Sequence, residues 1–121
     1  MFERIKLSAI NDHIWLFNDH DEATGYLITG AERALVIDTM NGYEDVHAVV
    51  RTLTDLPVMV INTHGHGDHV YGNIYFDTAY IHPADRKVAE SAFAEPEFRA
   101  ALAGTNLRPA EFRSVQEGDE I

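Results

Sequence analysis

Three histidines and one aspartate stand within six positions of a chain that contains seven histidines in total. They are His64, His66, Asp68 and His69, with glycines at 65 and 67 between them. Chance predicts roughly 0.002 occurrences of this pattern in a sequence of this composition. Imidazole and carboxylate groups ligate zinc, and they also suit iron or manganese. The pattern therefore predicts metal ligation, and the absence of cysteine excludes a thiolate site.

The spacing of these four side chains requires a bend in the backbone. In an extended strand, residues i and i+2 lie about 6.5 Å apart, too far for two nitrogens that each lie about 2.0 to 2.1 Å from one zinc ion. We therefore expect a loop in which Gly65 and Gly67 take positive φ angles and leave space beside the metal. An ordinary tight turn is the alternative interpretation of the two glycines.

Short strands must hold this loop in place. Alternation and turn-forming breaks at hairpin spacing predict strands at residues 5–10, 14–17, 25–29 and 34–38, arranged as an antiparallel meander. The periodic apolar residues Val46, Val49, Val50 and Leu53 predict an amphipathic helix over 43–54. The apolar run 58–61 predicts a strand buried on both faces, which leads directly into the histidine cluster.

The second half of the chain predicts fewer elements. We expect a strand at 79–81, a helix that begins at Pro83 and a second helical piece from Glu95 to about residue 104. Residues 105–121 are less periodic, and 117–121 resemble a turn that leads into a strand. His82 precedes a proline and is expected to be structural. Trp15 and Phe17 are expected to pack in the core.

Composition narrows the classes of partner. A chain of 121 residues with 45% apolar content predicts one compact domain. The formal charge of −11 argues against nucleic acid, whose phosphates would be repelled. No apolar run approaches the roughly 20 residues of a spanning helix, and the first residues lack a secretory signal pattern. We therefore expect a cytoplasmic protein without nucleic-acid or membrane partners.

The run from Thr63 to His69 resembles the signature of the metallo-β-lactamase fold superfamily. The likeness includes the order of elements, because a strand ending at Asp38, an amphipathic helix and a buried strand come before the motif. The resemblance implies that His64 and His66 ligate a first zinc ion, that Asp68 and His69 ligate a second, and that Asp38 supports the loop from the second shell. A turn or cap aspartate is the alternative for Asp38.

The resemblance also implies a fold and an activity. The fold would be α/β (α+β), the N-terminal half of an αβ/βα sandwich, with a mixed sheet and helices on one face. Residues 1–121 would form a single partial domain that lacks the second half. The activity would be zinc-dependent hydrolysis of an ester, thioester, lactone or similar bond in a small molecule, with Asp68 orienting the attacking hydroxide. The remaining ligands would come from the second half of the fold.

Half a sandwich would expose one apolar face of its sheet, which something must cover. A second copy in a homodimer, a separate chain with the missing half, or a longer protein of which this is a fragment would each do so. Two other functions therefore stay open. One is a non-catalytic metal-binding or assembly module completed by a partner chain, and the other is an iron-containing or manganese-containing member of the same fold.

Overall fold

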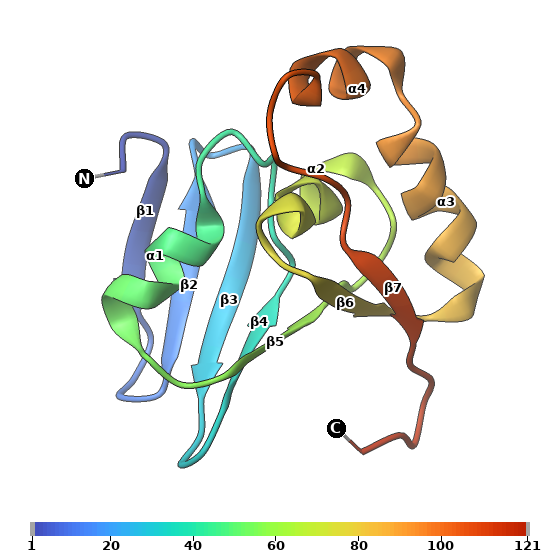
Figure 1. Ribbon diagram of the computed structural model, residues 1–121. Coiled ribbons are helices and arrows are strands. Elements are labelled where there is room, and N and C mark those ends of the chain that lie inside the picture. Colours follow the sequence, from blue (N-terminus) through green and yellow to red (C-terminus); the bar gives the residue numbers. More distant parts are fainter. Residues whose placement is uncertain (1, 121) are drawn as a thin grey trace.

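One mixed sheet runs through the part of the chain that the computed structural model describes, residues 2–120 (Figure 1). Its seven strands lie side by side in sequence order. The first four pair antiparallel and the last four pair parallel, so β4 belongs to both groups. The strands are β1 (Ile5–Ala9), β2 (Ile14–Asp19), β3 (Ala23–Thr29), β4 (Ala34–Ile37), β5 (Val58–Ile61), β6 (Thr78–Ile81) and β7 (Glu111–Ser114).

Helices connect the parallel strands. They are α1 (Val46–Leu53), α2 (Gly67–Val70), the 3-10 helix η1 (Tyr71–Tyr75), α3 (Pro83–Phe93) and α4 (Pro96–Leu102). Asp45 caps α1 by accepting a hydrogen bond from the Ala48 N–H. His82 caps α3 in the same way through Nδ1, which confirms that this histidine is structural. Within residues 2–120, no helix combines the length and apolar character needed to cross a bilayer.

Most predicted elements are confirmed to within a few residues at their ends. The sequence failed to predict α2, η1 and β7. Strand β7 was missed because only Phe112 among its four residues is withdrawn from solvent, so the strand carries no alternating pattern. The turn near residue 117 is confirmed, since the Asp119 N–H donates to the Gln116 carbonyl over 3.0 Å. The strand expected after it includes Ile121, which lies outside the described residues.

The main core lies between α1 and one face of the sheet (Figure 1). Val46, Val49 and Val50 of α1 are fully buried. They belong to the same cluster as four inward residues of successive strands, which are Phe17, Leu27, Val36 and Val60. Trp15 packs partly buried against this cluster, so the prediction that Trp15 and Phe17 are core residues is confirmed.

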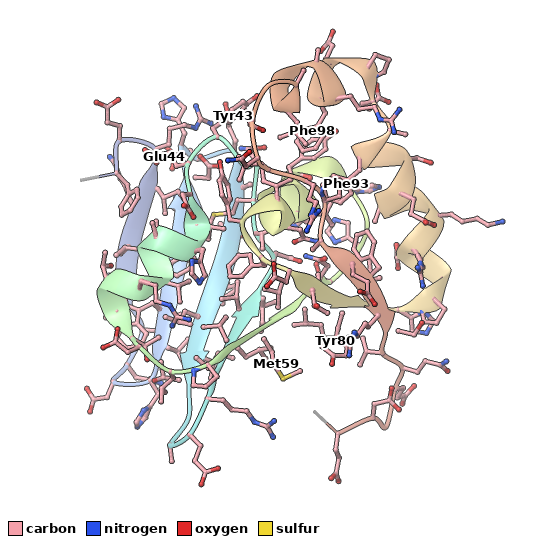
Figure 2. All side chains as sticks on the ribbon, viewed as in Figure 1. Tyr43, Glu44, Met59, Tyr80, Phe93 and Phe98 are labelled. Atoms are coloured by element: carbon pink, nitrogen blue, oxygen red, sulfur yellow. The ribbon has the colours of Figure 1, made fainter. Side chains whose placement is uncertain are left out.

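The opposite face of the sheet is apolar but incompletely covered. Cross-strand pairing aligns its side chains in two rows: Ile14, Ile28, Leu35 and Met59 in one, and Leu16, Tyr26, Ile37, Ile61 and Tyr80 in the other. None of these nine residues is buried. The C-terminal segment reaches only one border of this face, where Val115 and Asp119 line a hollow with Met59 and Tyr80. Figure 2 labels Met59 and Tyr80 side by side at this border.

Strand β5 therefore differs from its prediction. Val60 faces α1 and is 1% exposed, whereas Met59 and Ile61 point to the open face and stay partly exposed. Within residues 2–120 this strand is buried on one face only. Its continuous apolar sequence fits a sheet with a second covering layer.

Candidate metal centre

The candidate donors gather at the carboxyl ends of two parallel neighbours, β4 and β5. Asp38 directly follows β4, and residues 62–64 directly follow β5. The Asp38 N–H donates to the Ile61 carbonyl over 2.9 Å, which joins the two strand ends. In open parallel sheets, functional groups collect at this edge because the connecting loops meet there.

Of the four predicted ligands, the structure brings His64 and His69 together with Asp38 as a possible metal-binding group, and His66 and Asp68 lie beside this group without belonging to it. The ring centroid of His64 lies 4.0 Å from that of His69 and 4.8 Å from that of His66. Asp68 Oδ1 lies 3.7 Å from His69 Nε2. Asp38, His64 and His69 each offer one ligand atom, and these atoms lie within 4.8 Å of one another. His66 is exposed and the other three predicted ligands are half-buried, so the cluster is open to solvent on one side.

The backbone around the cluster is only partly the expected loop. Extended backbone ends at His66, the N-cap of α2, and the helix begins at Gly67. Asp68 and His69 therefore project from the first turn of a short helix. Residues 62–66 separate the end of β5 from this helical turn, and the bend between them solves the spacing problem because it brings residues 64 and 69 within ring contact.

Asp38 lies behind the cluster and is 5% exposed. Its Oδ1 accepts a hydrogen bond from the Thr63 N–H over 2.8 Å, and its Oδ2 accepts one from the Thr63 hydroxyl over 2.7 Å. Oδ2 also lies 2.9 Å from His69 Nδ1. These hydrogen bonds join the end of β4 to the end of β5. In the alternative interpretation, a turn aspartate, Asp38 would bond to its own neighbouring backbone instead.

The hydrogen bonds fix which ring nitrogens carry protons. A carboxylate only accepts, so the bond to Asp38 requires a proton on His69 Nδ1. The single hydroxyl proton of Thr63 goes to Asp38, so Thr63 Oγ1 must accept from His64 Nδ1, which lies 2.9 Å away. In the neutral form of each ring, this arrangement leaves a lone pair on Nε2. A metal ligand requires such a lone pair.

A second layer of buried polar groups holds the backbone of His69. Its carbonyl accepts from the Thr39 N–H over 3.0 Å and from Asn62 Nδ2 over 3.2 Å. Asn73 Nδ2 donates to Asn62 Oδ1 over 2.8 Å, and the Thr39 hydroxyl donates to Asn73 Oδ1 over 2.7 Å. Thr39, Asn62 and Asn73 are each at most 3% exposed.

The sequence did not assign functions to Thr39, Asn62, Thr63 or Asn73. Their only signal was position, because they flank Asp38 and the motif. Burial separates Thr39, Asn62 and Asn73 from the many polar side chains that remain in solvent, and the exposed Thr63 is distinguished by its bonds to Asp38; both signals require the fold.

The expectation of positive φ at Gly65 and Gly67 is wrong. The described glycines with positive φ are Gly42, Gly104 and Gly118. Close packing explains the motif glycines instead. A Cβ at Gly65 would lie 2.5 Å from the Ala89 nitrogen and 2.6 Å from the Asp85 oxygen of α3, and one at Gly67 would meet the Tyr71 ring. At this site the left-handed conformation belongs to Asp38 and Met40, with φ of 65° and 66°.

Tyr71 borders the cluster but is engaged in packing. Its hydroxyl donates to the Ala92 carbonyl over 3.1 Å, and its ring stacks on Phe98 with centroids 4.2 Å apart. Burial, reinforced by the charge of Glu95, raises the pKa of the phenol above its ordinary value. Tyr71 therefore stays a neutral hydrogen-bond donor that ties the motif to α3.

Comparison with known proteins identifies the family. The sequence profile described as the metallo-beta-lactamase superfamily matches residues 21–119, which is most of the chain. The chain belongs to the metallo-beta-lactamase superfamily. The matched range contains strands β3 to β7, the helices and the donor cluster, and it confirms the superfamily that the sequence resembles. No curated protein matches the chain.

Solved metallo-beta-lactamases share the fold. DIM-1 metallo-beta-lactamase superposes with a TM-score of 0.67 at 13% identity over 94% of this chain and 53% of its own. The metallo-beta-lactamase from Erythrobacter litoralis gives 0.65 at 18% identity over 96% and 52%. FIM-1 from Pseudomonas aeruginosa, solved in its mono-zinc form, gives 0.62 at 16% identity over 96% and 53%. The chain thus spans about half the length of these superfamily members.

Proposed function

We propose that this chain is part of a metal-dependent hydrolase and that it contributes half of a dinuclear zinc site. His64 and His66 would hold the first ion, and Asp68 and His69 the second. The observation that supports this most directly is the hydrogen-bond chain through Thr63 and Asp38. It leaves Nε2 of both His64 and His69 free to ligate, which is what a preformed metal site needs.

The donor set fits zinc. Three imidazoles and one carboxylate, with no thiolate, are within the range of ligands that zinc accepts, and the same set suits iron or manganese. FIM-1, a protein of the same fold, is described in a mono-zinc form. We therefore favour up to two zinc ions, and we keep iron or manganese as the alternative that elemental analysis decides.

The remaining chemistry follows from the positions of the side chains. Zinc, when bound, supplies a water whose lowered pKa makes hydroxide available near neutral pH. We assign to Asp68 the task of orienting the attacking group, because its carboxylate is half-buried and lies beside His69 Nε2. Asp38 and Thr63 keep the imidazole rings in one orientation. We propose an ester, thioester, lactone or similar bond in a small molecule as the substrate.

Further ligands must come from outside the proposed set. A tetrahedral catalytic zinc takes three protein ligands and one water, whereas each proposed pair supplies two. We propose that a second half of the same fold covers the open sheet face and adds those ligands. The two partly exposed rows of side chains that contain Leu35 and Ile37 support this proposal, since a covering layer would remove these apolar side chains from solvent. A second copy of the chain is the alternative cover.

A non-catalytic metal-binding or assembly module is the second candidate function. The observation that favours it is the short ligand supply, because two donors per ion suffice to bind metal but leave catalysis incomplete. For either function we propose a cytoplasmic protein. We also propose that it binds neither nucleic acid nor membrane, because its net charge of −11 repels anionic surfaces.

Metal binding and turnover together test these proposals. The unmodified chain is compared with three variants, His64→Ala, His66→Ala and Asp68→Ala. Zinc binding is measured by calorimetric titration and elemental analysis, and turnover is measured on thioester, lactone and ester substrates. His13→Ala, in an exposed turn, is the matched control. Zinc with turnover supports the hydrolase, and stoichiometric zinc without turnover supports the module. Metal binding that survives His66→Ala unchanged excludes the proposed ligand set.

A further inference from the structure

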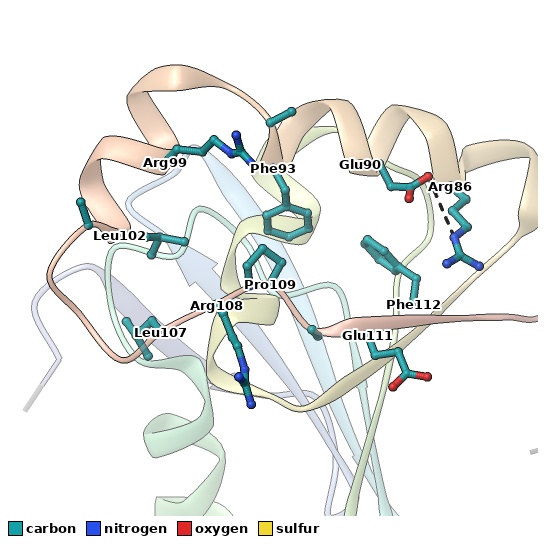
Figure 3. Close-up of a pocket in the computed structure, with 13 residues that line it drawn as sticks. Arg86, Glu90, Phe93, Arg99, Leu102, Leu107, Arg108, Pro109, Glu111 and Phe112 are labelled. Carbon is teal, nitrogen blue, oxygen red and sulfur yellow. Dashed lines mark ion pairs between the residues drawn. The ribbon is translucent and has the colours of Figure 1, made fainter.

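An apolar groove of about 590 Å³ lies between α3, α4 and the segment that leads into β7 (Figure 3). Phe93 and Phe112 line it from α3 and β7, Leu102 lines it from the end of α4, and Leu107 lines it from the segment after α4. None of the residues that line this groove belongs to the proposed metal ligands. The volume falls within the range of small-molecule sites.

The floor of the groove is held in place by aromatic contacts. The Phe93 ring lies 5.4 Å from the Phe98 ring and 5.9 Å from the Phe112 ring, between centroids. Phe98 in turn stacks on Tyr71. Figure 2 shows Phe93 and Phe98 directed toward each other from α3 and α4. An apolar ligand would therefore meet a preformed surface and would not have to order one.

Positive charge surrounds this groove in an otherwise acidic chain. Arg86, Arg99 and Arg108 line it, whereas the chain as a whole carries a formal charge of −11. Arg86 lies near Glu90, 4.0 Å away, so its charge is partly compensated. Within residues 2–120, the guanidinium groups of Arg99 and Arg108 have neither an ion pair nor a hydrogen bond to the protein. Glu111 also lines the groove and lies 3.8 Å from Arg113.

We propose that this groove binds a small organic anion with an apolar body, of the medium-chain carboxylate class. The aliphatic chain would lie on Phe93 and Leu102, where each buried methylene is favourable. The carboxylate would pair at the rim with Arg99 or with Arg108, which line the groove from opposite sides (Figure 3), and a planar guanidinium group matches the two oxygens of a carboxylate. Charge complementarity favours this class, because the chain as a whole is acidic whereas three arginines and two glutamates line this groove.

Amide chemical-shift mapping of the labelled chain with octanoate tests the proposal, and 1-octanol serves as the uncharged ligand of equal length. We expect saturable octanoate shifts between residues 86 and 112, and weaker binding of octanol. The Arg99→Gln/Arg108→Gln variant should weaken octanoate binding about fivefold, as expected for the loss of an exposed ion pair, and leave octanol binding unchanged.

The matched control removes the same charge elsewhere. Lys6→Gln/Lys87→Gln changes two exposed lysines that do not line the groove, and it should bind octanoate like the unmodified chain. Three results would each overturn the proposal. They are octanoate shifts confined to residues 64–69 or to the open sheet face, equal affinity for octanol, and equal weakening by the two double variants. Binding of an acidic apolar peptide without octanoate binding would also overturn it, in favour of a protein partner.

Discussion

His69 Nδ1 lies 2.9 Å from Asp38 Oδ2, and this contact joins the helix that follows β5 to the residue that follows β4. Thr63 bonds to both oxygens of the same carboxylate. One buried aspartate therefore determines the orientation of His69 directly and that of His64 through the Thr63 hydroxyl. The arrangement makes Asp38 the residue on which the geometry of both imidazoles depends.

Asp38→Asn should lower zinc affinity about 10-fold to 100-fold in a folded protein, as loss of supporting carboxylates does elsewhere. Asparagine tolerates the φ of 65° at this position, so the substitution removes charge with little backbone strain. Calorimetric zinc titration with circular dichroism of the same samples makes the measurement. Asp12→Asn, in an exposed turn, should bind zinc normally. Unchanged affinity in a folded Asp38→Asn protein would remove Asp38 from the site.

Gly65→Ala should destabilise the fold by about 1 to 3 kcal/mol, because the added methyl group meets backbone atoms that cannot turn aside. These atoms are the Ala89 nitrogen and the Asp85 oxygen. Gly30→Ala is the control, since its methyl group would meet a single carbonyl oxygen at 3.1 Å. Urea unfolding of both variants gives the comparison. Equal stability of the two would show that the loop is not pressed against α3.

Asn73→Ala should cost about 2 to 4 kcal/mol of unfolding free energy. It leaves Asn62 Oδ1 unsatisfied in a buried place, which costs about 1 to 3 kcal/mol, and it leaves the Thr39 hydroxyl with only its longer bond of 3.4 Å to the His69 carbonyl. Asn106→Ala, at an exposed loop position, should change stability little. Thermal and urea unfolding provide the values. A loss confined to zinc affinity, with normal stability, would contradict a structural function for the network.

Glu44 should make stability depend on pH. Burial alone would raise the pKa of its carboxyl, but backbone N–H groups of Ile5, Glu3 and Arg4 bond to it and lower the pKa below the ordinary 4.5. Its contribution is therefore complete above about pH 4.5 and is lost as pH falls through the lower folded-state pKa.

Comparison of Glu44→Gln with the unmodified chain tests this dependence. The variant should be less stable by about 1 kcal/mol at pH 7, and the difference should shrink in acid. Urea unfolding between pH 3 and 7, roughly the window in which carboxyl groups titrate, provides the data. Glu32→Gln, on an exposed hairpin turn, is the control. A stability difference that stays constant over this window would contradict the assignment.

The open sheet face should control association. Met59→Lys places a charge among Leu35, Ile61 and their neighbours, and it should weaken self-association or binding of a covering half at least tenfold, because a buried unpaired charge is costly. Ile10→Lys removes an exposed apolar residue outside this face and should have little effect. Sedimentation equilibrium measures both. If Met59→Lys associates as readily as Ile10→Lys, another surface makes the contact.

The elements and the donors could be predicted from the sequence because their signals are local. The helical period is carried by neighbouring residues, Val46, Val49 and Val50. The metal-binding pattern is likewise carried by a short stretch that contains His64, His66 and His69. Strand β7 and the short α2 helix left no such signal, since an exposed edge strand has no alternation and a single helical turn shows no period. The buried Thr39, Asn62 and Asn73 could not be predicted, because their burial results from contacts between segments far apart in the sequence.

The contact of Gly65 with α3 sets an order of assembly. The histidines on either side of this glycine leave the ribosome before the helix that their loop packs against. The backbone between them can reach its final packing only when residues 85 to 89 lie against it. The motif carries the proposed ligands, whereas residues on both sides of it in the chain hold it in place: Asp38 orients the rings, and α3 supports the backbone of Gly65.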